Sequence, residues 1–170
     1  MVILGIDPAI RTTGYGVIKA DPNAGDGMEI IDCGVICNKP SMPHTECLRR
    51  LCGGISELIE LYHPDCAVLE ESFVGRNAKT AIILGMARGG ILSSLAQHNI
   101  PAYAYNPSVA KRAATGSGSA EKSRIAFILA AEFGISVEKI PLDSTDALAL
   151  AMCHIQRLRF PTLNGIGKQL

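Results

Sequence analysis

A buried strand at the N-terminus that ends in an acid constrains the fold more than any other feature. Residues 2–6 form an apolar, largely β-branched run, Val-Ile-Leu-Gly-Ile, which is typical of a strand buried on both faces. Asp7 and Pro8 follow at once. Because an unpaired buried charge is costly, we expect Asp7 to lie at an opening in the fold, where cations, hydrogen bonds or water stabilise the carboxylate.

A second predicted strand also ends in acids. Residues 66–69 are a short apolar run, and Glu70 and Glu71 follow it. The preceding residues 44–62 carry apolar side chains three and four positions apart, which predicts an amphipathic helix. This pattern indicates an α/β fold, in which the carboxyl ends of neighbouring parallel strands meet at one edge of the sheet. We therefore expect Glu70 to lie near Asp7.

The remaining elements are expected from the same patterns. Residues 14–19 and 28–37 are further strand candidates, and the short turn after the first strand predicts an antiparallel hairpin. The later elements are expected to be a helix over residues 78–98, a strand over 101–105, a short helix from 107, and helices over about 120–133 and 142–158. Small residues in the helix over 78–98 are consistent with either a close core contact or a dimer interface.

Lys122 occupies an unusual place in its predicted helix. Ser119 is the expected N-cap, so Lys122 falls in the first turn, where a cation opposes the helix dipole. A nearby anion would explain this placement, and glycine-flanked helix N-termini are good phosphate sites. An exposed lysine, tolerated at a cost of a few tenths of a kcal/mol, on the order of the exposed dipole effect, explains it equally well.

Two more acids begin the last predicted helix. Asp143 and Asp146 are three residues apart and share a face. Each is also explained as an N-cap or a first-turn acid, but the apolar run 147–152 indicates that this helix packs on the sheet. Together with Asp7 and Glu70 they form a set of hard oxygen ligands that suits Mg²⁺ or Mn²⁺ and not zinc. Two metals about 3.5–4 Å apart would clamp a phosphate, so the sequence predicts phosphodiester hydrolysis.

The charge distribution is uneven although the formal net charge is zero. Residues 1–70 contain ten acidic and five basic residues, whereas residues 71–130 contain seven basic and two acidic ones. This asymmetry suits a protein that gathers carboxylates at one point and presents cations to phosphates around it. Charge alone favours the simpler interpretation of ordinary solvated faces.

Composition indicates one soluble domain. The chain has 170 residues, of which 48% are hydrophobic, enough for a proper core. Its six cysteines form no CxxC pair, so buried free thiols are expected rather than disulfides or zinc. No segment has the pattern of a signal peptide or a membrane span, and we expect a cytoplasmic protein with no membrane partner.

Five motifs in order resemble the bacterial RuvC Holliday-junction resolvases. These motifs are Asp7-Pro8 with Thr13-Gly14-Tyr15-Gly16-Val17, Leu69-Glu70 followed by Phe73, Asn77 and Ala78, Gly85 to Gly89, Gly118-Ser119-Ala120-Glu121-Lys122-Ser123, and Asp143 with Asp146-Ala147-Leu148-Ala149. The resemblance covers about residues 1–158. One departure is Ala9, where the family more often has glycine; it restricts the loop backbone but removes no metal ligand.

The resemblance implies an RNase H-like α/β fold. It implies a five-stranded mixed sheet with an antiparallel second strand, flanked by helices on both faces, over residues 1–158. Independently of the resemblance, residues 159–170 are expected to form a flexible tail, because Phe160 and Pro161 end the last helix. It further implies a homodimer that resolves four-way DNA junctions by paired symmetric nicks in recombination and repair. It leaves open whether a RuvA–RuvB branch-migration complex is a partner.

The resemblance also implies roles for individual residues. The expected catalytic residues, which also bind two Mg²⁺ ions or Mn²⁺ in their place, are Asp7, Glu70, Asp143 and Asp146; the expected DNA contacts are Phe73, Lys111 and Lys122. Phe73 would stack on bases at the opened crossover, or it anchors a buried loop. Two-metal hydrolysis would leave 5′-phosphate and 3′-hydroxyl ends. No histidine is required, although His154 lies about two turns past Asp146.

Three other functions share parts of this pattern. A sugar-kinase or actin-like ATPase also begins with a strand, an acid and a Gly/Thr turn, but it needs a second, duplicated domain, and this chain has no internal repeat. A related enzyme that acts on RNA has the same acids and differs in substrate preference. A non-catalytic junction-binding protein would keep the cations and lose an acid. Metal-dependent cleavage distinguishes it from a nuclease.

Overall fold

The N-terminal apolar run forms a central strand of a mixed sheet. The computed structural model describes residues 1–21, 27–71, 77–160 and 167–170. Its strands are β1 (Val2–Asp7), β2 (Thr12–Ala20), β3 (Met28–Cys37), β4 (Cys66–Glu70), β5 (Ala102–Tyr105) and β6 (Lys168–Gln169), in the sheet order β3-β2-β1-β4-β5-β6. The strands β1, β4 and β5 run parallel, and β2, β3 and β6 are each antiparallel to their neighbours. The predicted α/β class and the antiparallel second strand are confirmed.

The expected number of five strands is wrong. The sixth strand, β6, pairs with β5 through Tyr103 with Gln169 and Ala104 with Lys168. Local patterns could not predict it, because two residues have no periodicity and the strand exists only through its pairing. The predicted tail over residues 159–170 therefore includes β6, and its residues 161–166 lie outside the described residues.

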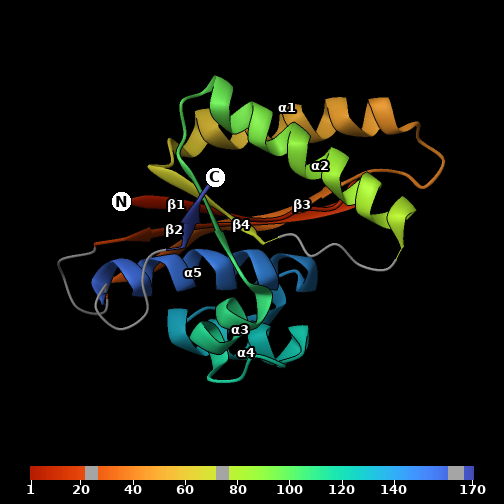
Figure 1. Ribbon diagram of the computed structural model, residues 1–170. Helices are drawn as coiled ribbons and strands as arrows, with labels where there is room; N and C mark the ends of the chain where they lie inside the picture. The colour runs from red at the N-terminus through yellow and green to blue at the C-terminus, as the bar shows by residue number, and fades with distance from the viewer. Residues whose placement is uncertain (22–26, 72–76, 161–166) are drawn as a thin grey trace.

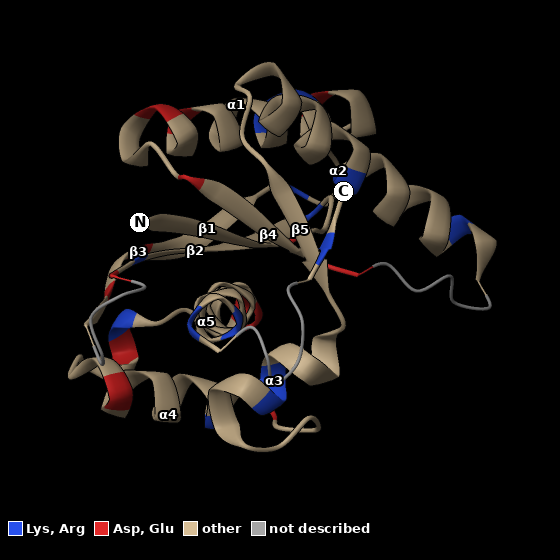
Figure 2. Ribbon diagram, turned by 60° about the vertical axis from the view of Figure 1, so that its left-hand side comes forward, with Lys and Arg blue, Asp and Glu red and all other residues tan. Residues whose placement is uncertain are grey.

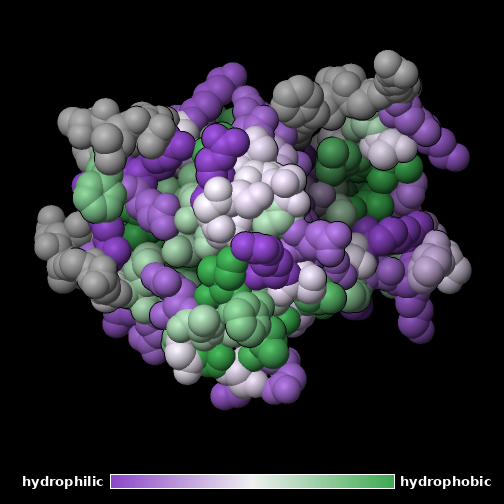
Figure 3. Space-filling model, turned by 90° about the horizontal axis from the view of Figure 1, so that it is seen from below, coloured by the Kyte–Doolittle hydropathy of each residue, from purple (hydrophilic) through white to green (hydrophobic). Residues whose placement is uncertain are grey.

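Helices cover both faces of the sheet (Figure 1). The helices α1 (His44–Tyr62) and α2 (Ala78–Gln97) lie on one face, and α3 (Pro107–Thr115), α4 (Lys122–Phe133) and α5 (Thr145–Arg159) lie on the other. A hydrophobic core lies on each face of the sheet, and successive side chains of β1 point into different cores. Ile3 packs with the α3–α5 layer and Leu4 with the α1–α2 layer, as the alternation of side chains along a strand requires. The outer surface on the α3–α4 side mixes apolar and polar groups (Figure 3).

The starts of two helices differ from the expected ones. The helix α4 begins at Lys122 with Glu121 at the N-cap, so the expectation that Ser119 caps it is wrong. Ala120 is buried in the core, and Glu121 has extended backbone angles, so the chain is still extended where the helix was expected. Residues 142–144 form a short 3₁₀ turn, η2, and α5 starts only at Thr145.

The described residues contain neither a membrane-spanning helix nor a disulfide bond. No helix among them is both long and apolar enough to cross a membrane. All six cysteines are free, as expected, and Cys47, Cys66 and Cys153 are buried. Cys37 is exposed, so burial of the thiols is only partly confirmed.

Candidate active site

The sheet brings the two strand-end acids together. Ile6 pairs with Leu69 in the parallel ladder between β1 and β4, so Asp7 and Glu70, the next residue on each strand, lie at the same edge. Both side chains are half-buried. They line a hollow of about 220 Å³ together with Pro8, Glu71 and Leu84 of α2. Asp7 and Glu70 therefore lie near each other, as expected.

Glycines on the sheet allow the second pair of acids to reach this edge. A Cβ atom on Gly14 would lie 1.8 Å from the carbonyl oxygen of Asp143, and one on Gly5 would lie 1.9 Å from that of Ala147. Only glycine permits such close backbone approach. The turn η2 and the start of α5 therefore lie directly on β1 and β2. Since Gly14 pairs with Asp7 across the hairpin, this contact brings the 143–146 segment to the acidic end of β1.

The four acids interact electrostatically. Burial raises the pKa of Asp7 to about 7, with further contributions from the negative charges of Glu70, Asp146 and Asp143. Burial also raises the pKa of Glu70, and the charge of Asp146 adds to it. Such upward shifts arise when carboxylates share one poorly solvated site. The cluster therefore requires nearby cations to remain fully ionised.

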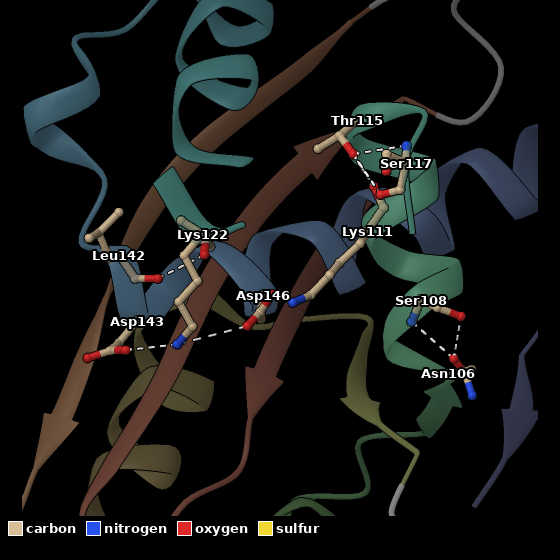
Figure 4. A network of polar contacts seen from close by, with 10 residues as sticks. Asn106, Ser108, Lys111, Thr115, Ser117, Lys122, Leu142, Asp143 and Asp146 are labelled. Carbon is tan, nitrogen blue, oxygen red and sulfur yellow. Dashed lines mark hydrogen bonds and ion pairs between the residues drawn. The ribbon is translucent and has the colours of Figure 1, made fainter. Parts of the chain in front are cut away.

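Two lysines supply part of this positive charge (Figure 4). Lys122 Nζ lies 2.8 Å from Asp143 Oδ1 and 3.9 Å from Asp146 Oδ2. Lys111 Nζ, from α3, lies 3.3 Å from Asp146 Oδ1. The anion that explains a lysine at the start of α4 is thus Asp143 of the same chain. Basic residues on α3 and acidic residues after β4 also mark this end of the molecule in Figure 2.

The donor set fits a hard divalent cation. Asp146 Oδ1 is buried and accepts no hydrogen bond from the described residues, because its contact with Lys111 is an ion pair without hydrogen-bond geometry. Carboxylate oxygens are the ligands that Mg²⁺ and Mn²⁺ prefer. Within the described ranges, no three Asp, Glu, His or Cys side chains enclose a metal site as they stand. Lys122 instead lies between Asp143 and Asp146, where it balances their charge.

Arg88 is a cation of this site that the sequence patterns did not identify. It lies on α2, and its Nη1 donates a hydrogen bond to the backbone oxygen of Glu70. Its charge lowers the pKa of Glu70, together with those of Lys111 and Lys122. The available signal was a single arginine within a helix that is otherwise rich in small and apolar residues. The helical pattern did not show which strand this arginine would meet.

Two other residues considered from the sequence do not enter the described site. Phe73 lies outside the described residues. His154 is buried beneath the sheet, where its Nδ1 lies 2.8 Å from the Tyr105 hydroxyl and its ring packs on Tyr103. Burial lowers the pKa of His154 to about 4. Its contacts are those of a core residue.

Comparison with known proteins relates this site to one family. The family model described as crossover junction endodeoxyribonuclease RuvC matches residues 3–154. A RuvC of Chloroflexus aggregans is 39% identical over 167 residues, covering 98% of this chain and 99% of the relative. A RuvC of Caldicellulosiruptor saccharolyticus is 41% identical over 155 residues, covering 91% and 92%.

The fold agrees with a solved structure over its whole length. The structure of Thermus thermophilus RuvC in complex with a Holliday junction substrate superimposes with a TM-score of 0.87 at 29% identity, covering 100% of this chain and 99% of the other. Sequence and fold therefore agree on one assignment. The chain belongs to the RuvC family of crossover junction endodeoxyribonucleases.

Proposed function

We propose that this protein is a structure-selective endonuclease that resolves four-way DNA junctions during homologous recombination and repair. The observation that carries the proposal is the meeting of four carboxylates and two lysines at the carboxyl edge of the sheet, in a chain of the RuvC family. The similarity to T. thermophilus RuvC, which was solved with a Holliday junction substrate, supports the choice of DNA substrate. The proposed unit is an RNase H-like nuclease domain over residues 1–158 that acts as a homodimer and makes paired symmetric nicks.

We assign the proposed roles as follows. The catalytic and metal-binding residues are Asp7, Glu70, Asp143 and Asp146; the DNA contacts are Lys111, Lys122 and Phe73. Two Mg²⁺ ions, with Mn²⁺ as a substitute, would supply activation of a water molecule and stabilisation of the leaving oxygen, giving 5′-phosphate and 3′-hydroxyl ends. The support for this metal chemistry is the donor set and the buried Asp146 oxygen without a hydrogen bond.

The lysines connect DNA binding to metal binding in this proposal. Lys122 is held by Asp143 and Asp146, and Lys111 by Asp146. A backbone phosphate at the cluster would offer both ammonium groups another anion. When the two lysines turn towards the phosphate, the carboxylates lose their internal counter-charges. They would then bind divalent cations more readily. Lys122 then neutralises charge at the scissile phosphate.

Cleavage of a synthetic mobile four-way junction with Mg²⁺ tests the proposal. The wild type is expected to make paired symmetric nicks. Asp7→Asn and Glu70→Gln are expected to bind the junction without cutting it, since each removes one carboxylate charge and keeps the side-chain shape. The matched control is Glu29→Gln, which changes an exposed acid on β3 and is expected to cut normally.

The other outcomes separate the alternatives. Binding by the wild type without cutting, under any divalent metal, would replace the nuclease with a non-catalytic junction-binding protein. Preference for an RNA substrate would indicate a related enzyme of different specificity. Neither binding nor cutting would refute the substrate assignment.

A further inference from the structure

Arg88 approaches the acid cluster from the helical layer opposite the lysines. The helices α3 and α4, which carry Lys111 and Lys122, lie on one face of the sheet, and α2 lies on the other (Figure 1). Arg88 follows Leu84 by about one helical turn, and Leu84 lines the hollow beside Asp7 and Glu70. Arg88 therefore lies one turn from the wall of this hollow, on the face of the sheet opposite the two lysines.

The hydrogen bond of Arg88 is made to the backbone at a strand end. The ladder between β1 and β4 ends at Ile6 and Leu69, and the oxygen that Arg88 Nη1 contacts belongs to Glu70, one residue further. On the other side of β4, the amide of Glu71 donates to Tyr105 O at 2.7 Å. The backbone around Glu70 is thus held by β5 on one side and by the side chain of Arg88 from α2.

This contact differs in kind from those of the lysines. Lys111 and Lys122 contact carboxylate oxygens that a metal would use, so they compete with it. Arg88 contacts a carbonyl oxygen and leaves both carboxylate oxygens of Glu70 available. It is half-buried, and burial of a guanidinium is retained only where the charge and its donors have partners. Glu70 and Glu71 are the acids that stabilise its charge.

We propose that Arg88 is a positioning residue that fixes the backbone of Glu70 and thereby the direction of its carboxylate towards the metal-binding cluster. The inference rests on the proposed function of Glu70 as a metal ligand. Residues that hold metal ligands in place commonly contribute about 10–100-fold to metal affinity or activity, because a misplaced reactive group loses rate steeply.

The test compares Arg88→Met and Arg88→Lys with the wild type. Mn²⁺ affinity is measured on the DNA-free protein by electron paramagnetic resonance, and single-turnover junction cleavage is measured at saturating Mn²⁺. Circular dichroism establishes the folded fraction of each variant. Lys79→Met, an exposed position on the same helix, is the control for loss of one positive charge and is expected to leave Mn²⁺ affinity unchanged.

Arg88→Met is expected to weaken Mn²⁺ binding by about tenfold and to lower the saturating cleavage rate by about 10–100-fold. Arg88→Lys, which keeps a charged donor, is expected to restore both. The direction of the affinity change is decisive. A purely electrostatic role would tighten Mn²⁺ binding when the cation is removed, and a merely structural role would leave the affinity of the folded protein unchanged; either result overturns the proposal.

The two proposals fail separately. A wild type that binds Mn²⁺ but cuts no junction would refute the proposed function, while the Mn²⁺ affinities would still decide the role of Arg88. A wild type that cuts normally, with Arg88→Met at the same rate and Mn²⁺ affinity, would refute the role of Arg88 alone.

Discussion

At the scale of single residues, the acid cluster contains its own counter-cations. Lys122 contacts Asp143 and Asp146 directly, so a divalent cation bound by these acids would have to displace it. We expect Lys122→Met to strengthen Mn²⁺ binding to the DNA-free protein by about 3–10-fold. This range corresponds to an interaction of about 1 kcal/mol between the partly exposed lysine and the aspartates. Equilibrium Mn²⁺ titration with Lys79→Met as the control checks this. Weaker binding by Lys122→Met would show that the lysine supports the metal site and does not compete for it.

His154 makes the stability of the protein sensitive to acid. Burial lowers its pKa in the folded state from the ordinary histidine value of 6.5 to about 4. Between these values the unfolded chain binds a proton that the folded chain does not, so the stability is complete above pH 6.5 and falls as the pH decreases. We expect the wild type to lose about 2 kcal/mol of unfolding free energy between pH 7.5 and pH 5 through this residue.

Urea unfolding at the two pH values measures this loss against His154→Phe. The phenyl ring keeps the packing on Tyr103, and the Tyr105 hydroxyl keeps its hydrogen bond from the amide of Gly167. The carboxylates titrate in both proteins. The difference between the two proteins in the loss of unfolding free energy from pH 7.5 to pH 5 therefore reports on His154 alone. An equal pH dependence in both would contradict the neutral, buried state of this histidine.

At the scale of elements, the docking of α5 on the hairpin determines whether the site forms. Gly14 faces the carbonyl oxygen of Asp143 too closely for any side chain. We expect Gly14→Ala to destabilise the protein by about 1–3 kcal/mol, as overpacking does, and to reduce junction cleavage further than the loss of folded protein explains, since η2 and Asp143 must move away from Asp7.

The control for Gly14→Ala is Gly53→Ala on α1. A Cβ atom there meets nothing within 4 Å, and alanine in place of a helical glycine stabilises by about 0.5–1 kcal/mol. Thermal or urea unfolding gives both stabilities, and cleavage per folded molecule gives the activity. Normal cleavage by folded Gly14→Ala would show that the close contact between β2 and η2 is not needed.

At the scale of the whole molecule, the outer face of α2 is the surface that we propose for the homodimer interface. Ile82 is 65% exposed, and Gly85 and Gly89 have no neighbouring atoms where a Cβ would lie. Of the small residues noted in the sequence, Gly90 approaches the core at Cys52 Sγ, whereas Gly85 and Gly89 do not. A core contact therefore explains Gly90, and Gly85 and Gly89 are the positions that we propose for the interface between copies.

If α2 forms the interface of the proposed homodimer, a charged residue on this surface should separate the two copies. We expect the wild type to sediment as a dimer and Ile82→Glu to sediment as a monomer that no longer makes paired nicks, since a buried unpaired charge disfavours association. Leu61→Glu, at an equally exposed position on α1, is the control and should remain dimeric. A monomeric wild type would contradict the homodimer, and a dimeric Ile82→Glu would place the interface elsewhere.

The sequence by itself determined the elements and the chemistry of their ends. The predicted bounds of β3 and α1 agree with the structure, and Asp7 and Glu70 end β1 and β4 as expected. These features are encoded locally, because periodicity and chain-breaking residues act over a few positions. The types of the acids also predicted a hard-cation site before their positions were known.

Tertiary structure alone decided the features that depend on distant segments. The strand β6 exists by pairing with β5, α4 starts only after Ala120, which is buried in the core, and Arg88 meets Glu70 from another layer. The acids at 143 and 146 reach Asp7 because glycines on β1 and β2 leave space for α5. Each of these contacts joins residues far apart in the chain, and local propensity carries no information about which distant backbone will lie opposite.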